Sequence, residues 1–166
     1  MIMISIEKVT INIGVGEAGE KLEKAKKLIE KMTGQKSVER VSNKRIPTWN
    51  VRKGLALGAK TTLRGEKAKV FLNKCLDAVE RRIKPTSFDK FGNFSFGIKE
   101  YIEIPGFKYD PEIGMFGFDV CVTMHKWGYR VNKRKVKKSR YPMRHVIKKE
   151  ETIEFMKKNF NVEVSE

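Results

Sequence analysis

Three glycines in the first part of the chain have the spacing of a dinucleotide-binding motif. Gly14, Gly16 and Gly19 form a GxGxxG pattern between a strand-like stretch and a helical one, and Glu39 follows the last glycine by 20 residues. In doubly wound folds such glycines let the backbone approach a pyrophosphate, and a later acidic residue binds the ribose. A dinucleotide-dependent enzyme that uses these four residues is therefore one hypothesis.

The residues around the glycines argue against this hypothesis. Apolar residues alternate with polar ones over residues 8–13, and Lys8 and Asn12 are among the polar ones. The first strand of a doubly wound fold is buried on both faces and is continuously apolar. The further strand–helix pairs that would build a parallel sheet do not follow. We therefore interpret the glycines as residues that allow a tight turn from a strand to a helix.

Most of the positive charge lies in two segments, which points to a polyanionic partner. The 166-residue chain has a formal net charge of +16, of which residues 36–65 contribute +7 and residues 126–149, without any acidic residue, contribute +11. Aromatic residues accompany the cations, with Trp49 in the first segment and Trp127 and Tyr141 in the second. A single charge run is typical of a solvated face or a disordered tail. Two such segments on a nearly neutral scaffold favour binding to RNA or DNA.

The residues that could serve a metal site or catalysis form no recognisable pattern. Cys75, Cys121, His125 and His145 lack the spacing of zinc ligands, and no nucleophile has a base nearby. We expect two buried, reduced thiols, no metal, no cofactor and no catalytic activity. No apolar run approaches the roughly 20 residues of a membrane-spanning helix, and no signal-peptide pattern is present. We therefore expect a soluble, cytoplasmic protein without a membrane partner.

The apolar pattern predicts an α+β fold. Two amphipathic helices are expected over residues 20–32 and 67–83, and strands over residues 8–13, 37–41, 59–64, 94–104 and 118–124. Because each element has one apolar face, the helices must cover one face of a mostly antiparallel sheet. The uncovered face would carry the amide of Asn12, the hydroxyl of Thr62 and the cations of Lys8, Lys60 and Arg64. Such groups suit the phosphate oxygens and 2′-hydroxyls of RNA.

The connection between the strands at 37–41 and 59–64 is much longer than an ordinary hairpin loop. It contains Pro47, Trp49 and Gly54 among several cations. Long loops within a compact domain commonly carry function, and we predict that this one reaches out to a nucleic acid.

Several runs of the sequence resemble a known family. They are IEKVTINIGVGEA at 6–18, TGQK at 33–36, VRKG at 51–54, KTTLRG at 60–65, Phe88-Asp89, GNFSFGIKE at 92–100 and Tyr109-Asp110. In order and spacing, over about residues 6–124, the chain is similar to the large-subunit ribosomal protein family number five. The basic segment that follows resembles the archaeal and eukaryotic branch of that family.

The resemblance implies a non-enzymatic component of the cytoplasmic large ribosomal subunit. Members of the family bind 5S rRNA in the central protuberance, beside large-subunit rRNA and neighbouring 5S-associated ribosomal proteins. The implied 5S rRNA site consists of Asn12, Gln35 and Thr62, with phosphate or sugar contacts from Lys8, Lys36, Lys60 and Arg64. The resemblance also implies that the loop 44–57 is directed at P-site tRNA, through Lys44, Arg45, Pro47, Thr48, Trp49, Asn50, Arg52 and Lys53.

The second basic segment, residues 126–149, is interpreted as an RNA-binding arm. Its candidate contacts are Lys126, Arg130, Lys133, Arg134, Lys135, Lys137, Lys138, Arg140 and Arg144. The arm is too basic and too irregular to pack, and such arms commonly order only against nucleic acid. We expect one domain, residues 1–166, in which residues 150–166 form a short helix and a tail. An RNA-binding protein that acts outside the ribosome is the remaining alternative.

Overall fold

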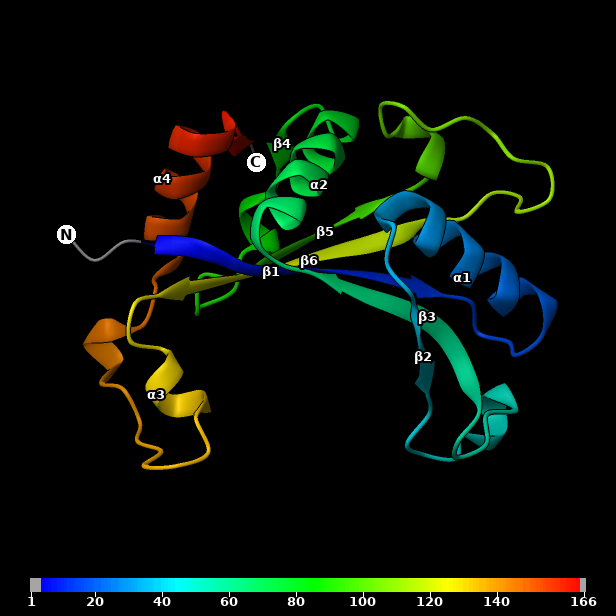
Figure 1. Ribbon diagram of the computed structural model, residues 1–166, viewed down its shortest axis with the longest axis horizontal. Helices are drawn as coiled ribbons and strands as arrows, with labels where there is room; N and C mark the ends of the chain where they lie inside the picture. Colours follow the sequence, from blue (N-terminus) through cyan, green and yellow to red (C-terminus); the bar gives the residue numbers. More distant parts are fainter. Residues whose placement is uncertain (1–3, 165–166) are drawn as a thin grey trace. The chain divides into compact units, whose positions relative to one another are not determined.

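The computed structural model, which describes residues 4–164, contains a five-stranded sheet (Figure 1). The ends of the predicted domain, residues 1–3 and 165–166, lie outside the described residues. The strand order is β2-β3-β1-β6-β5, and a second sheet pairs β4 with β7. The strands are β1 (Ile4–Gly14), β2 (Val38–Val41), β3 (Ala56–Leu63), β4 (Arg82–Ile83), β5 (Phe94–Ile98), β6 (Phe118–Lys126) and β7 (Glu163–Val164). The helices are α1 (Glu20–Thr33), α2 (Gly65–Ala78), α3 (Arg130–Lys133) and α4 (Lys149–Phe160). The predicted α+β class with a mostly antiparallel sheet is confirmed.

The chain forms two compact units. The first contains residues 1–9, 64–96 and 121–166, of which the structure describes 4–9, 64–96 and 121–164, and the second contains residues 10–63 and 97–120. Strands β1, β5 and β6 contribute residues to both units. The expectation of a single domain stays a prediction. No helix within residues 4–164 is long and apolar enough to cross a membrane.

In the second unit, α1 packs against β3. The predicted apolar stripe of α1 is confirmed, since Leu22, Ala25, Leu28, Ile29 and Met32 are all buried. The helix ends where Gly34 adopts a left-handed conformation and its amide donates a 2.8 Å hydrogen bond to the carbonyl oxygen of Glu30. Strand β2 then pairs antiparallel with β3, while all four of its side chains remain exposed.

In the first unit, the second predicted helix is shorter than expected. The apolar stripe of α2 is buried from Ala68 to Leu76, but the helix ends at Ala78 rather than at Ile83. The backbone then takes left-handed conformations at Glu80 and Arg81, and Ile83 becomes part of β4. Strand β4 pairs in parallel with β7, so the predicted C-terminal tail contains a strand. Pairing with a distant segment therefore overrides the local helical pattern.

The strand predicted over residues 94–104 is also shorter. β5 ends at Ile98, and a 3₁₀-helix follows over Tyr101–Glu103. This turn changes which side chains face inward, so Tyr101, expected on the polar face, is 1% exposed. Its hydroxyl accepts a 2.9 Å hydrogen bond from the amide of Asp110.

The two cysteines differ in their surroundings. Cys75 is buried on α2, and this burial raises the pKa of its thiol to about 12. Cys121, which was expected to be buried, is exposed. The strand alternation explains this difference, because Val120 and Val122 on β6 occupy the core side and Cys121 points to the opposite side.

Candidate RNA-binding surfaces

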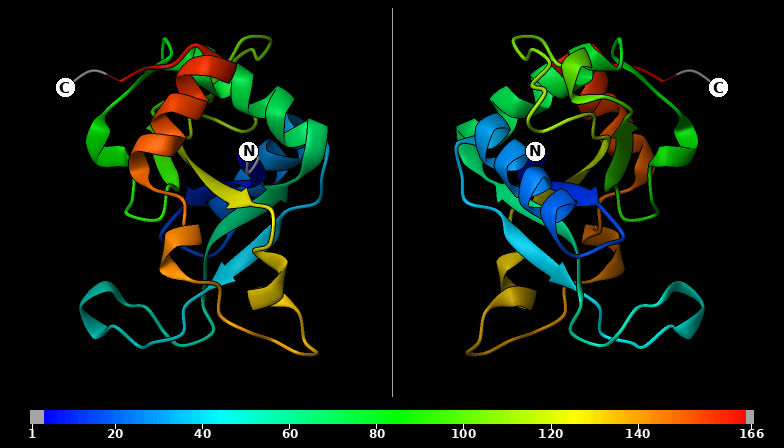
Figure 2. Two further views of the ribbon diagram at one scale, coloured as in Figure 1. Left: turned by 90° about the vertical axis from the view of Figure 1, so that its left-hand side faces the viewer. Right: turned by 90° about the vertical axis from the view of Figure 1, so that its right-hand side faces the viewer.

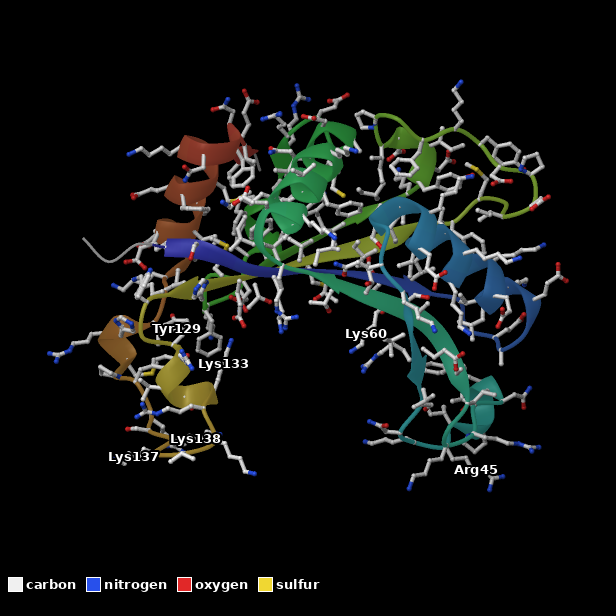
Figure 3. All side chains as sticks on the ribbon, in the orientation of Figure 1. Arg45, Lys60, Tyr129, Lys133, Lys137 and Lys138 are labelled. Atoms are coloured by element: carbon white, nitrogen blue, oxygen red, sulfur yellow. The ribbon has the colours of Figure 1, made fainter. Side chains whose placement is uncertain are left out.

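Two adjacent strands of the second unit present the predicted polar residues on one face. On β1, Ile11 and Ile13 are fully buried and Asn12 between them is half-buried. On β3, Lys60 and Thr62 are half-buried and alternate with the buried Ala59, Thr61 and Leu63. Figure 3 shows the Lys60 side chain on the side of β3 that faces away from α1. The helix thus covers the apolar face and leaves the polar face open.

The other candidate contacts for 5S rRNA lie outside these strand positions. Gln35 and Lys36 are in the connection from α1 to β2. There the Thr33 hydroxyl donates a 2.7 Å hydrogen bond to the Ile29 carbonyl oxygen and accepts one of 3.2 Å from the Gln35 amide, which fixes the backbone of the connection. Lys8 has the same parity on β1 as Asn12 but belongs to the first unit, as does the exposed Arg64 before α2.

The long loop between β2 and β3 is an ordered extension of the hairpin (Figure 2). At its base, the Ser42 amide donates to the Leu55 carbonyl oxygen at 2.9 Å, and the Gly54 amide donates to the Ser42 carbonyl oxygen at 2.8 Å. Nearer the tip, the amides and carbonyls of Ile46 and Val51 pair reciprocally around a 3₁₀-helix over Pro47–Trp49. The backbone of the tip is therefore held by its own hydrogen bonds.

The hairpin tip presents its cations and its indole to solvent. All the loop residues predicted to face tRNA are exposed, among them Arg45, which Figure 3 shows at the end of the hairpin, and Trp49, which is 73% exposed. The one acidic residue of this basic segment, Glu39, forms an ion pair with Lys26 of α1. No carboxylate within residues 40–65 offsets the cations of the tip, so it is a concentrated positive surface.

Two backbone amides of the glycine motif form hydrogen bonds within the protein. The amides of Val15 and Gly16 both donate 2.9 Å hydrogen bonds to the carbonyl oxygen of Leu57 on β3. Because both amides are used within the protein, they are not available to a pyrophosphate. The Glu39 carboxylate, which would bind a ribose, pairs with Lys26 instead. The motif therefore forms the turn from β1 to α1 and joins it to β3.

The basic arm is folded within the first unit, contrary to the prediction that it would not pack. Lys126 is 6% exposed at the end of β6, and its ammonium donates a 2.6 Å hydrogen bond to Glu151 of α4. Burial by itself would raise the pKa of the Glu151 carboxyl, but Lys126 and the Lys148 amide outweigh it and hold that pKa below its usual value. Lys126 therefore anchors the arm to α4, and its buried ammonium is not available to RNA.

Further contacts fix the arm between its two ends. The Lys133 ammonium of α3 pairs with Glu7 of β1, and the Ile147 amide donates a 2.8 Å hydrogen bond to the hydroxyl of Tyr129. The Tyr129 ring stacks on Tyr141 with 4.5 Å between ring centroids. Sequence reasoning missed Glu7 and Glu151 because no local pattern connects them with their partners.

The remaining cations of the arm are available to a partner. Lys133 of α3 is partly engaged by its ion pair with Glu7, whereas Figure 3 shows Lys137 and Lys138 on the exposed loop that follows α3. The exposed cations of the arm are Arg130, Lys133, Arg134, Lys135, Lys137, Lys138, Arg140, Arg144 and Lys148. Within residues 4–164 no cluster of three or more His, Cys, Asp or Glu side chains could hold a metal ion.

Comparisons with known proteins agree with a ribosomal role. The family model for the C-terminus of the ribosomal L5 family matches residues 56–155, and the model described as ribosomal protein L5 matches residues 1–52. The chain belongs to the ribosomal protein L5 family. This uL5 family consists of structural proteins of the large ribosomal subunit. The hypothesis of a dinucleotide-dependent enzyme is therefore wrong.

Similar proteins come from several archaea, as the resemblance of the basic arm predicted. The large ribosomal subunit protein uL5 of Sulfurisphaera tokodaii is 54% identical over 98% of this chain and 93% of its own length. The protein of the same name from Sulfolobus acidocaldarius is 53% identical over 98% of this chain and 92% of its own. That of Methanosphaera stadtmanae is 50% identical over 96% and 95%. The similarity to these uL5 proteins thus includes the basic arm.

Proposed function

We propose that this protein helps to anchor 5S rRNA in the central protuberance of the large ribosomal subunit. The observation that carries the proposal is the open polar face of β1 and β3, where Asn12, Lys60 and Thr62 lie opposite the face that α1 covers. An amide and a hydroxyl can donate to and accept from 2′-hydroxyls and base edges, while the ammonium of Lys60 binds phosphate. Gln35 and Lys36, which precede β2, add to this site, and Lys8 and Arg64 of the first unit are further candidate contacts for 5S rRNA.

We further propose that the hairpin tip, residues 44–57, contacts P-site tRNA. The tip carries exposed cations without a carboxylate of its own segment beside them, and its backbone hydrogen bonds hold it as an extension of the sheet. The phosphate backbone of tRNA offers the matching charge. Large-subunit rRNA and neighbouring 5S-associated proteins would complete the surroundings of the protein in the cytoplasmic ribosome.

A titration of the purified protein tests the first proposal. The protein is titrated with 5S rRNA and, in parallel, with a tRNA of similar charge. Tighter binding to 5S rRNA than to tRNA supports the proposal. Equal affinity for the two RNAs contradicts it and indicates a basic protein that binds RNA without selectivity. A basic RNA binder of that kind would also suit a role outside the ribosome.

Substitutions then test the assigned residues. Asn12→Ala, Gln35→Ala and Thr62→Ala should each lower the affinity for 5S rRNA roughly 2- to 10-fold, the equivalent of one hydrogen bond. Asn73→Ala is the matched control, because Asn73 is an exposed amide on α2. If all three variants bind 5S rRNA as tightly as the control does, the proposed site is wrong.

A crosslinking experiment tests the hairpin tip. Ribosomes are reconstituted with the protein carrying a photoreactive group at position 49, and the P site is filled with tRNA. A crosslink from the tip to tRNA supports the second proposal. A crosslink to rRNA alone, with the P site filled, contradicts it.

A further inference from the structure

A hollow lined by aromatic and basic side chains lies in the arm of the first unit. Its volume is about 560 Å³, and its lining includes Trp127, Val131, Arg140, Tyr141, Arg144 and His145. The volume falls within the range of small-molecule binding sites. Neither the polar strand face nor the hairpin tip uses these residues.

The Trp127 indole is presented to solvent from a fixed backbone. Trp127 is 75% exposed. Its backbone carbonyl oxygen lies 2.7 Å from Nε2 of His145. Gly128, the next residue, has a positive φ of 101°, and a Cβ there would lie only 3.1 Å from the same nitrogen. The close approach of His145 therefore favours glycine at 128 and holds the chain beside the indole.

Stacked rings hold one wall of the hollow in place. The Tyr141 ring lies parallel to Tyr129, with 3° between the ring planes, and His145 approaches both rings edge-on. The Tyr129 hydroxyl accepts a hydrogen bond from the Ile147 amide, and Ile147 is fully buried. Because the wall is ordered within the protein itself, a ligand would not have to order it on binding.

The charge around the hollow selects an anionic ligand. Arg140 and Arg144 of the lining are exposed, and no acidic residue occurs anywhere in residues 126–149. The ligand must therefore combine negative charge with a flat surface for the exposed indole. A nucleotide whose base is not stacked on its neighbours has both features, since its base has a π-face and its phosphate pairs with guanidinium groups.

We propose that this hollow binds an unstacked nucleobase of single-stranded RNA. The base stacks on Trp127, and Arg140 and Arg144 bind the adjoining phosphates. A base inside a duplex cannot occupy the site because both of its faces are already covered. The proposal extends the RNA-binding function proposed above to a second, separate site on the chain.

Fluorescence of Trp127 tests the stacking directly. The chain has two tryptophans, so Trp49→Phe leaves Trp127 as the single reporter. The folded full-length protein is titrated with a short single-stranded oligoadenylate, an abasic strand of equal length, an RNA duplex of equal length and poly-glutamate. Quenching by the oligoadenylate alone supports the proposal. Equal responses to the abasic strand or the duplex contradict base stacking, and a response to poly-glutamate alone points to an acidic protein partner instead.

Affinity measurements complete the test. In the same background, Trp127→Ala should weaken oligoadenylate binding roughly 5- to 150-fold, the effect of losing one stacked base, while Trp127→Phe should retain most of the affinity. Val136→Ala is the matched control, because Val136 is 73% exposed in the same arm and does not line the hollow. If Trp127→Ala binds as tightly as Val136→Ala, the proposal is wrong.

The same variants separate this inference from the proposed function. Selective binding of 5S rRNA that is weakened by Asn12→Ala, together with unquenched Trp127, leaves the proposed function standing and overturns the base site. Quenching of Trp127 by oligoadenylate without any preference for 5S rRNA supports the base site and overturns the proposed function.

Discussion

Lys126 donates a 2.6 Å hydrogen bond to Glu151 from a position that is almost wholly buried. Lys126 is the first residue of the basic arm and Glu151 lies two residues after its last, so this pair holds the two ends of the arm together. The same carboxylate accepts a 3.0 Å hydrogen bond from the Lys148 amide, at the start of α4. One carboxylate therefore both begins a helix and neutralises a buried ammonium.

Loss of this carboxylate should destabilise the protein. Glu151→Gln leaves the Lys126 ammonium buried without a counter-ion, which we expect to lower the free energy of unfolding by about 1–3 kcal/mol. Urea unfolding followed by circular dichroism measures the change. Glu150→Gln is the matched control, since Glu150 is an exposed acid in the same turn of α4. Equal stability of the two variants would show that the buried pair contributes nothing.

Stability should also fall on acidification. Burial would raise the pKa of the Glu7 carboxyl, but the Lys133 ammonium, with smaller contributions from Lys8 and His125, outweighs burial and lowers that pKa. The pKa of Glu151 is lowered as well. Because the folded-state values lie below the unfolded-state value of about 4.3, the stabilisation is complete above that pH. It is lost as the pH falls through the folded-state values.

Unfolding curves at a series of pH values test this dependence. The variant that carries both Glu7→Gln and Glu151→Gln should lose less stability than the wild type as the pH falls below about 4. Parallel stability profiles of the two proteins in that range would assign the acid sensitivity to other carboxyls.

Gly92 should be far less tolerant of substitution than other glycines in the same backbone conformation. Its φ is 72°, and a Cβ would lie 2.6 Å from Cγ2 of Ile147 and 2.6 Å from Oγ1 of Thr152. The Thr152 hydroxyl already donates a 2.9 Å hydrogen bond to the Gly92 carbonyl oxygen. Gly54, with a φ of 85°, has no atom within 4 Å of such a Cβ.

The two glycines form a matched pair for thermal unfolding. Both substitutions to alanine share the cost of a left-handed backbone, about 1–2 kcal/mol. Gly92→Ala should cost about 1–3 kcal/mol more than Gly54→Ala, because the core around Ile147 must also shift. Equal melting temperatures of the two variants would mean that Ile147 and Thr152 can move away from the added Cβ without loss of stability.

Binding of 5S rRNA should depend steeply on salt if charge holds the complex. Neutralisation of about six phosphates would lower the affinity roughly a thousandfold between about 50 and 200 mM salt. Replacing Lys60 with Met should reduce the slope by roughly one phosphate contact. A flat dependence would show that the cations are not what holds the RNA.

Local patterns of side chains were sufficient to predict much of the fold and part of the site. The alternation around Asn12 identified the buried and open faces of β1, and the stripe from Leu22 to Met32 identified the covering surface of α1. Composition located the two basic segments. These features could be predicted because strand and helix periodicities are local, and because charge is a property of residues rather than of their arrangement.

Long-range pairing decided what the sequence did not reveal. The apolar residues up to Ile83 continue a helical pattern, but Ile83 instead pairs with Val164 of β7 as part of strand β4. The Leu57 carbonyl oxygen uses the amides that would otherwise suggest a nucleotide site. Lys133 and Glu7, 126 residues apart, anchor an arm whose composition indicated disorder. Each of these contacts joins segments that are distant in the chain, so only the tertiary structure could decide which partner each group has.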